Sequence, residues 1–172
     1  MASELSGGSA RSALIALGGN VGDVRSTFRK AIAHICGMAQ AVLLARSSDY
    51  LTPPWGDEQQ APFVNACIEI ETALDPHALL FVLHRVEQKF GRDRSKERRW
   101  GPRTLDLDLI AYDDVSLQRP ELTLPHPHLF ERAFVLVPLA EIAPGRLIAG
   151  RRVSDALEQV STGGIERLPE AD

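Results

Sequence analysis

Two aspartates two positions apart, Asp106 and Asp108, are the residues of this chain best suited to hold a metal ion. Side chains two positions apart in an extended strand project from the same face, about 6 to 7 Å apart. Aspartate forms strands poorly, so its presence twice favours a functional role. Because Mg²⁺ takes one or two protein carboxylates and completes its shell with substrate phosphates and water, the pair predicts a divalent-metal site beside a phosphorylated substrate. The alternative is the solvent-exposed face of an amphipathic strand.

A cationic stretch precedes the aspartates. Eight Lys or Arg residues and three acids lie between Arg85 and Arg103, a local net charge of +5 in a chain whose net charge is −4. Guanidinium forks match the oxygens of a polyphosphate, which favours a metal–nucleotide site over a merely solvated loop. The chain contains neither a P-loop nor a kinase catalytic-loop motif, so the two commonest nucleotide-binding architectures are excluded.

The helix before this stretch has clear ends in the sequence. Asp75 suits the N-cap, Pro76 the first helical position and Gly91 the C-cap. Apolar stripes and period-two alternation predict the other elements. We expect strands at residues 13–17, 41–45, 63–71, 105–110, 115–124 and 165–168. We expect helices at residues 24–37 and 129–140, the second interrupted or ended near Pro138, and a last short helix capped by Ser154. Residues 50–56 should be irregular.

Helices fall between hairpin-like strand pairs instead of following every strand, which predicts an α+β fold, a ferredoxin-like, mainly antiparallel sheet with helices packed on it. We expect residues 1–12 to be a disordered tail and residues 13–172 to be a single domain. The content of 44% hydrophobic and 24% charged residues, without an apolar run of about 18 residues, excludes a disordered chain and a membrane span. Cys36 and Cys67 lie in apolar contexts without a CxxC motif, which predicts buried thiols in a cytoplasmic protein.

Residues 99–108 closely resemble the signature of the 6-hydroxymethyl-7,8-dihydropterin pyrophosphokinases, which transfer the β,γ-diphosphate of ATP to a pterin alcohol in folate biosynthesis. Further motifs occur in the order and approximate spacing of that family, at Gly18–Asn20, Tyr50–Pro54, Phe63–Ala66, Gly91–Arg92, Leu124–His126 and Arg132–Phe134. The resemblance extends from about Ala13 to Pro144.

This resemblance implies two Mg²⁺ ions at Asp106 and Asp108 and ATP as co-substrate, with Arg92 and Arg103 joining the aspartates as catalytic residues. The implied ATP-binding residues are Glu87, Arg92, Arg94, Trp100, Arg103, Leu109, Thr123, His126 and Arg132. The implied pterin-binding residues are Gly18, Thr52, Pro53, Pro54, Trp55, Phe63, Asn65, Trp100, Asp106 and Phe134. An amide both donates and accepts hydrogen bonds, as the mixed edge of a pterin requires, and aromatic side chains suit stacking on a flat heterocycle.

The chain departs from the family pattern in several places. Gly19 stands where many members have serine, and Phe63 keeps the stacking face of the tyrosine found in many members but lacks its hydroxyl. The cationic loop is one residue longer than in shorter members, which leaves open which of Arg94, Lys96 and Arg98 reaches the nucleotide.

Two other functions are compatible with the residues. A ferredoxin-like sheet with a basic, aromatic loop can bind RNA, although paired aromatics on adjacent strands are missing and the aspartates would repel a phosphate backbone. A metal-dependent nucleotidyltransferase with the same aspartate pair would release pyrophosphate instead of AMP. The partners that we expect are ATP and the pterin, with no nucleic acid, no membrane and no obligatory protein partner.

Overall fold

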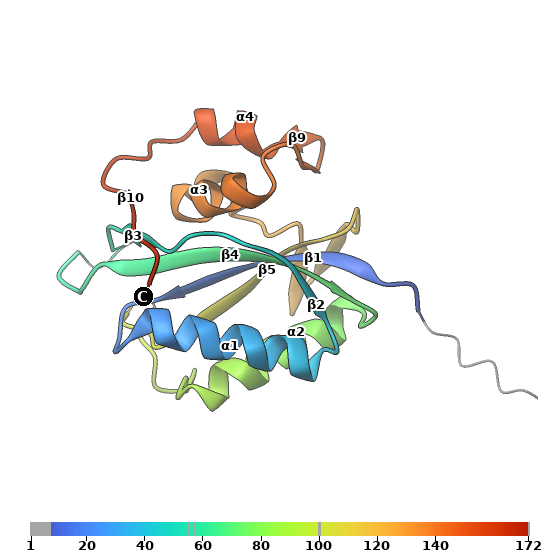
Figure 1. The fold of residues 1–172 in the computed structure, drawn as a ribbon, viewed down its shortest axis with the longest axis horizontal. Helices are drawn as coiled ribbons and strands as arrows, with labels where there is room; N and C mark the ends of the chain where they lie inside the picture. Colours follow the sequence, from blue (N-terminus) through green and yellow to red (C-terminus); the bar gives the residue numbers. More distant parts are fainter. Residues whose placement is uncertain (1–7, 55, 57, 100, 172) are drawn as a thin grey trace, which may run out of the picture.

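The computed structural model describes residues 8–54, 56, 58–99 and 101–171, and its centre is a six-stranded antiparallel sheet (Figure 1). The strand order is β10-β3-β4-β1-β5, and β2 also pairs with β4. The strands of this sheet are β1 Arg11–Gly19, β2 Val42–Arg46, β3 Tyr50–Thr52, β4 Phe63–Thr72, β5 Asp106–Tyr112 and β10 Glu166–Arg167. The predicted α+β fold with a mainly antiparallel sheet is therefore confirmed.

One face of the sheet is covered by the helices α1 (Val24–Met38) and α2 (Pro76–Lys89), which lie below it in Figure 1. Both begin as predicted, because Asp23 and Asp75 each accept a hydrogen bond from the backbone N–H three residues further on. At the end of α2, Phe90 is the cap and Gly91 follows in the left-handed conformation, with φ of +88°.

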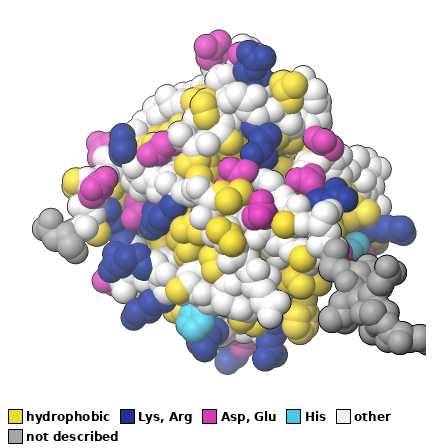
Figure 2. All heavy atoms as spheres, turned by 45° about the vertical axis from the view of Figure 1, so that its right-hand side comes forward, with side chains coloured by type: hydrophobic (Ala, Val, Ile, Leu, Met, Phe, Trp, Pro, Cys, Tyr) yellow, Lys and Arg dark blue, Asp and Glu magenta, His cyan; other side chains and the backbone are white. Residues whose placement is uncertain are grey.

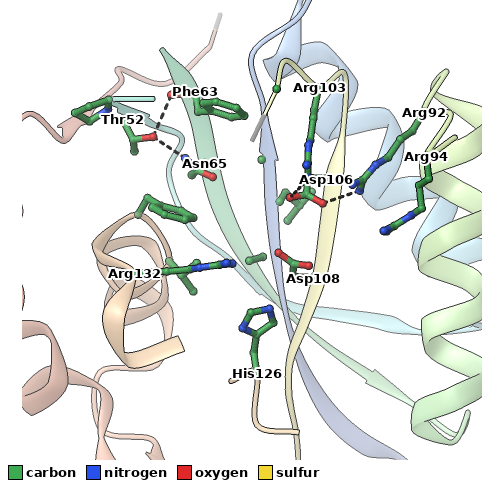
Figure 3. Close-up of a pocket in the computed structure, with 17 residues that line it drawn as sticks. Thr52, Phe63, Asn65, Arg92, Arg94, Arg103, Asp106, Asp108, His126 and Arg132 are labelled. Carbon is green, nitrogen blue, oxygen red and sulfur yellow. Dashed lines mark hydrogen bonds and ion pairs between the residues drawn. The ribbon is translucent and has the colours of Figure 1, made fainter. Parts of the chain in front are cut away.

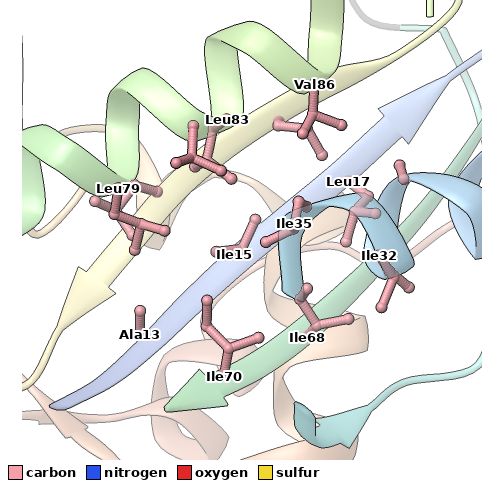
Figure 4. Close-up of a cluster of buried hydrophobic side chains, with 14 of the residues drawn as sticks. Ala13, Ile15, Leu17, Ile32, Ile35, Ile68, Ile70, Leu79, Leu83 and Val86 are labelled. Carbon is pink, nitrogen blue, oxygen red and sulfur yellow. The ribbon is translucent and has the colours of Figure 1, made fainter. Parts of the chain in front are cut away.

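The main core lies between these two helices and the sheet (Figure 4). Leu79 and Leu83 of α2 and Ile35 of α1 are fully buried against Ile15 and Ile68, which alternate with residues of the opposite face along β1 and β4. Each such side chain stabilises the fold by roughly 1.5 to 3 kcal/mol through removal of apolar surface from water.

The opposite face of the sheet carries a second, smaller core. Its cover is formed by η1 (Leu129–Glu131), α3 (Ala133–Ile142), the hairpin of β8 (Leu147–Ile148) and β9 (Arg151–Arg152), and α4 (Val153–Glu158). Leu14 and Ile110 of the sheet pack there against Leu136 and Leu139. This cover leaves one end of the sheet face open, and the candidate site lies at that end.

Several expected elements differ from the structure. Residues 50–52 form strand β3, because the long β4 strand offers them a pairing partner despite the prolines that follow. Pro138 lies inside α3, which continues to Ile142. Arg152, one residue before the helix, is the N-cap of α4, and Ser154 lies within that helix. The first strand begins at Arg11, inside the expected tail, because it continues its pairing with β4.

Residues 117–124 form a separate hairpin of β6 (Leu117–Arg119) and β7 (Leu122–Leu124) instead of one strand from residue 115. The predicted edge strand near the C-terminus is confirmed as β10. Both cysteines are free thiols, with Cys67 buried and Cys36 only partly so. None of the helices in the described part of the chain has the length and apolarity of a membrane span.

Candidate active site

Three neighbouring strands bring the predicted site residues into two rows on the partly covered face of the sheet. In the first row, Gly18 of β1 lies between Asn65 of β4 and Asp106 of β5. In the next row, Ala16 lies opposite Asp108. Asn65 and Asp106 are two strand spacings apart, roughly 10 Å. Ala16 carries only a methyl group and Gly18 has no side chain, so β1 leaves open space above this face of the sheet.

These rows form the floor of an open cleft of about 230 Å³ (Figure 3). Its walls come from the end of β3, the start of α3, the loop after α2 and the segment before η1, so distant parts of the chain converge on it, as is typical of a binding site. The predicted site residues that line it are Gly18, Thr52, Pro53, Phe63, Asn65, Arg92, Arg94, Arg103, Asp106, Asp108, His126, Arg132 and Phe134.

The two aspartates lie in the middle of this cleft (Figure 3). Asp106 accepts hydrogen bonds from Arg92 at 2.6 Å and from Arg103 at 3.5 Å. Burial raises the pKa of Asp108 to about 7, and the charge of Asp106 adds to this effect, whereas Arg132 opposes it. The negative charge of Asp108 is therefore poorly compensated by the residues around it. Two adjacent carboxylates in this state can act as ligands of a divalent cation, whose charge would supply the compensation. Since the described residues offer no cluster of three or more metal-ligating side chains, substrate oxygens and water would have to supply the other ligands.

Arg92 connects the loop after α2 to this carboxylate pair. Its side chain is only 3% exposed, and its guanidinium donates to Glu87, to both carboxylate oxygens of Glu97 at 3.0 Å, and to Asp106. Three acids therefore surround one arginine, which is the arrangement that a buried charge needs.

Glu87 lies behind these arginines and does not line the cleft, but it lines a neighbouring pocket together with Arg92 and Arg94. Its contact with ATP stays a prediction. Its side chain is 1% exposed, and it accepts hydrogen bonds from Arg94 at 2.9 Å and from the backbone N–H of Leu107 at 3.0 Å. Burial raises the pKa of this carboxyl, whereas Arg92 and the Leu107 N–H lower it. Its position on the buried face of α2 lets it hold both guanidinium groups toward the cleft.

His126 and Arg132 point toward Asp108 from the opposite side (Figure 3). Burial, followed by the charges of Arg132 and His128, lowers the pKa of His126 to about 4, so its ring is neutral at neutral pH. The Nδ1 atom accepts the backbone N–H of His128 at 3.2 Å. In the neutral ring, the Nε2 atom then carries the proton, and this N–H can donate a hydrogen bond to an anionic oxygen.

The other end of the cleft combines aromatic rings with one amide. Asn65 is 8% exposed, and its Nδ2 atom donates to the Thr52 hydroxyl at 2.7 Å. Phe63 lines the cleft two residues away on β4, and Phe134 lines it from α3, with the Arg132 guanidinium 5.6 Å from its ring centre. This end can hold a flat heterocycle with a polar edge.

Asn20 organises the site, although from the sequence it was named only as part of the Gly18–Asn20 motif and not among the site residues. Its backbone N–H donates to the Arg103 carbonyl and its Oδ1 atom accepts the Arg103 N–H, both at 2.9 Å. Its Nδ2 atom donates to the Gln60 side chain and to the Ala61 carbonyl, both at 3.0 Å. The Gly18–Asn20 motif is the signal that could have identified it, because asparagine directly after a glycine-ended strand commonly bonds to neighbouring backbone.

The remaining expectations divide into two groups. Leu109 faces the main core, Thr123 bonds back to Arg119 within the β6–β7 hairpin, and neither they nor Pro54 line the cleft. Trp55 and Trp100 lie outside the described residues. Four lining residues were not predicted, namely Ala16, Leu17, Gly101 and Val135, and strand alternation could have found only the first.

Comparisons with known proteins agree on one family. Residues 14–144 match the family model described as 7,8-dihydro-6-hydroxymethylpterin-pyrophosphokinase. A 2-amino-4-hydroxy-6-hydroxymethyldihydropteridine pyrophosphokinase of Methylorubrum extorquens is 47% identical over 156 residues, which cover 91% of this chain and 98% of that relative. A protein of the same name from Bacillus subtilis is 45% identical over 130 residues, covering 76% and 77% of the two chains.

A solved structure has the same fold. The wild-type Plasmodium falciparum HPPK-DHPS with pteroate superposes with a TM-score of 0.68 at 12% identity, over 87% of this chain and 42% of that one. This chain therefore spans less than half of the solved protein, and the likeness concerns the fold alone.

Proposed function

Because the chain belongs to the 7,8-dihydro-6-hydroxymethylpterin-pyrophosphokinase family and transfers pyrophosphate from ATP to hydroxymethyldihydropterin, we propose that the cleft on β1, β4 and β5 holds both substrates side by side. The observation that carries this assignment is the register in which Gly18 separates Asn65 from Asp106. A pterin bound by Asn65 would direct its hydroxymethyl group over β1 toward the aspartates, where the phosphates would lie.

The pterin subsite consists of Phe63, Asn65 and Phe134. The rings of Phe63 and Phe134 would stack on the two faces of the heterocycle, and the Asn65 amide would pair with its edge. Thr52 supports this function indirectly, because its hydroxyl accepts one N–H of Asn65 and thereby orients the amide. The Pro53 ring closes the subsite at the end of β3.

The triphosphate would lie along the cationic side of the cleft. Arg92, Arg94, Arg103 and Arg132 line it, and the neutral ring of His126 adds an N–H donor. Guanidinium groups bind phosphate oxygens in pairs, so these residues can fix the position of the β-phosphorus and stabilise the charge that moves during transfer. The backbone of Arg103 is held in place for this function, because both its N–H and its carbonyl are hydrogen-bonded to Asn20.

Asp106 and Asp108 would hold two Mg²⁺ ions together with phosphate oxygens. Ions bound there would neutralise charge on the triphosphate and lower the pKa of the attacking hydroxyl. In the transfer itself, the hydroxymethyl group loses its proton to water and its oxygen bonds to the β-phosphorus. The bond from that phosphorus to the oxygen that bridges it to the α-phosphorus breaks, and AMP leaves with that oxygen. The chain contributes positioning and electrostatic stabilisation, and no covalent protein intermediate is needed.

We further propose that residues 13–172 act as one domain in the cytoplasm and need no nucleic acid, membrane or obligatory protein partner. The free thiols of Cys36 and Cys67 support a reducing compartment. The two cores share one sheet, which supports a single folding unit.

Identification of the products tests the site assignment. The purified protein with ATP, hydroxymethyldihydropterin and Mg²⁺ should yield AMP and the pterin diphosphate, measured by chromatography and ³¹P NMR. Asp106→Asn and Asp108→Asn should abolish AMP formation, whereas an exposed carboxylate change such as Glu158→Gln should not. Full AMP formation by either aspartate variant would refute the assignment.

A further inference from the structure

The C-terminal segment lies outside the region that matches the family model, and it packs against the strand that carries one wall of the pterin subsite. The match ends at residue 144, whereas the chain continues through α4 to β10. In Figure 1 this segment, drawn in red, crosses from α4 to the edge of β3. Glu166 pairs there with Leu51 and Arg167 with Tyr50, so that β3 lies between β10 and β4.

Side-chain and backbone contacts tie this segment to its surroundings beyond the strand pairing. Arg167 donates to the Ser48 hydroxyl at 2.8 Å and forms an ion pair with Glu141 of α3 at 3.5 Å. The Leu168 N–H donates to the Asp49 carbonyl at 2.9 Å. Glu141 also accepts hydrogen bonds from Ser48 and from Tyr50 of β3, so the segment, β3 and α3 share one polar network.

Gly164 of this segment lies directly against Pro53. Its φ of +80° lies in the left-handed region, and a Cβ atom added there would lie 2.8 Å from the Cγ atom of Pro53. A real Cβ atom does not tolerate such a distance, so the backbone at this position lies against the proline ring because it has no side chain. Pro53 lines the cleft, and its neighbour Thr52 accepts the hydrogen bond that orients Asn65.

We propose that residues 164–169 are a positioning element of the pterin subsite, which act by fixing Pro53 and Thr52 and, through them, the Asn65 amide. β3 has only three residues and is followed by two prolines, and its pairing with β4 ends at Thr52, so Pro53 lies beyond the strand pairing. Recognition of a heterocycle edge depends on the amide position to within a fraction of an ångström. The proposal rests on the assignment of the pterin to Phe63, Asn65 and Phe134.

The test compares two glycines that share a left-handed backbone but not the contact. Gly164→Ala adds strain and a clash with Pro53, whereas Gly150→Ala adds strain at φ +78° with no atom within 4 Å of the new methyl group. Dissociation constants are measured for hydroxymethyldihydropterin, through its fluorescence, and for α,β-methylene ATP with Mg²⁺. We expect Gly164→Ala to weaken pterin binding at least about fivefold through a misplaced amide, with ATP-analogue binding unchanged, and Gly150→Ala to change neither.

A second variant avoids dependence on the folding of Gly164→Ala. Arg167 is 63% exposed, so Arg167→Ala removes its bonds to Ser48 and Glu141 without opening a cavity. It should weaken pterin binding in the same selective way, and Arg29→Ala, an exposed arginine on α1, serves as its control. Circular dichroism and thermal melting verify that each variant is folded.

The same two dissociation constants are measured for Asn65→Ala, so that failure of the positioning proposal can be distinguished from failure of the subsite assignment. If Asn65→Ala weakens pterin binding but Gly164→Ala and Arg167→Ala leave it unchanged, or weaken both ligands equally, the positioning function is wrong while the subsite stands. If Asn65→Ala leaves pterin binding unchanged, the subsite assignment is wrong and this inference fails with it.

Discussion

Gly18 and Asn65 are register partners on adjacent strands, and a Cβ atom at Gly18 would lie 2.8 Å from the Asn65 Oδ1 atom. The glycine therefore serves close approach and not backbone flexibility, since it lies within the regular strand β1. Its missing side chain lets the amide lie low over the sheet and bond to Thr52. The same absence opens the path from the amide to Asp106.

Gly18→Ala should displace the Asn65 amide and weaken pterin binding. An unpaired heterocycle edge costs about 1 to 3 kcal/mol, which corresponds to roughly 5- to 150-fold in the dissociation constant. Gly37→Ala is the control, because its methyl group meets no atom within 4 Å on an exposed helix position. It should leave binding unchanged and raise the melting temperature slightly, since alanine favours helix. Equal pterin affinities of wild type and Gly18→Ala would contradict this prediction.

Asn65→Ala and Asn65→Asp should both weaken pterin binding far more than binding of an ATP analogue. Alanine removes the hydrogen bonds, and aspartate, which can only accept, loses the donor that a mixed edge requires. The expected loss is again roughly 5- to 150-fold for the pterin. Titration calorimetry with each ligand measures both effects. Similar losses for the two ligands would mean that Asn65 is structural.

Asp108→Asn should inactivate the protein yet stabilise its metal-free form. The pKa of Asp108 is about 7 in the folded state against an ordinary value of 3.8, so the folded state binds more protons between these pH values. Stability therefore falls as the pH rises through this range, and asparagine removes the loss. In thermal melting with EDTA, the melting temperature of this variant should exceed that of the wild type by more at pH 8 than at pH 4.

Asp106→Asn provides the contrast for that experiment, because Asp106 is paired with Arg92 and Arg103. Removal of its charge leaves the nearly buried Arg92 with one partner fewer, so this variant should be less stable than wild type at pH 8 while it is equally inactive. A stabilised Asp106→Asn or a destabilised Asp108→Asn would show that the two carboxylates do not differ as described.

Asn20→Ala should lower kcat/KM for both substrates, since one side chain anchors the loop end at Arg103 and the segment at Gln60 and Ala61. The expected decrease is about tenfold or more, because misplacement of site residues by about an ångström has effects of that size. Asn20→Asp keeps the acceptor for Arg103 but loses the donor for Ala61, so it should retain part of the activity. Steady-state kinetics in each substrate measure the effect, and unaltered kinetics in Asn20→Ala would refute it.

The sequence alone determined the elements whose signals are local. The cap residues around α2 and the apolar stripe of residues 24–37 predicted two helices, and alternation placed Asp106 and Asp108 on one face of a strand. These features depend on residues within a few positions of each other, which is why pattern analysis finds them. The resemblance to the family signature then implied which charged residues would share one site.

Tertiary structure decided everything that depends on a distant partner. Residues 50–52 became a strand because β4 and β10 offered hydrogen bonds on both sides, against the local signal of the prolines. Glu87 lies behind Arg92 and Arg94 because the packing of α2 buries the helix face that carries it. The close approaches at Gly18 and Gly164 likewise arise from segments far apart in the chain, since an absent side chain has no pattern that reveals what lies against it.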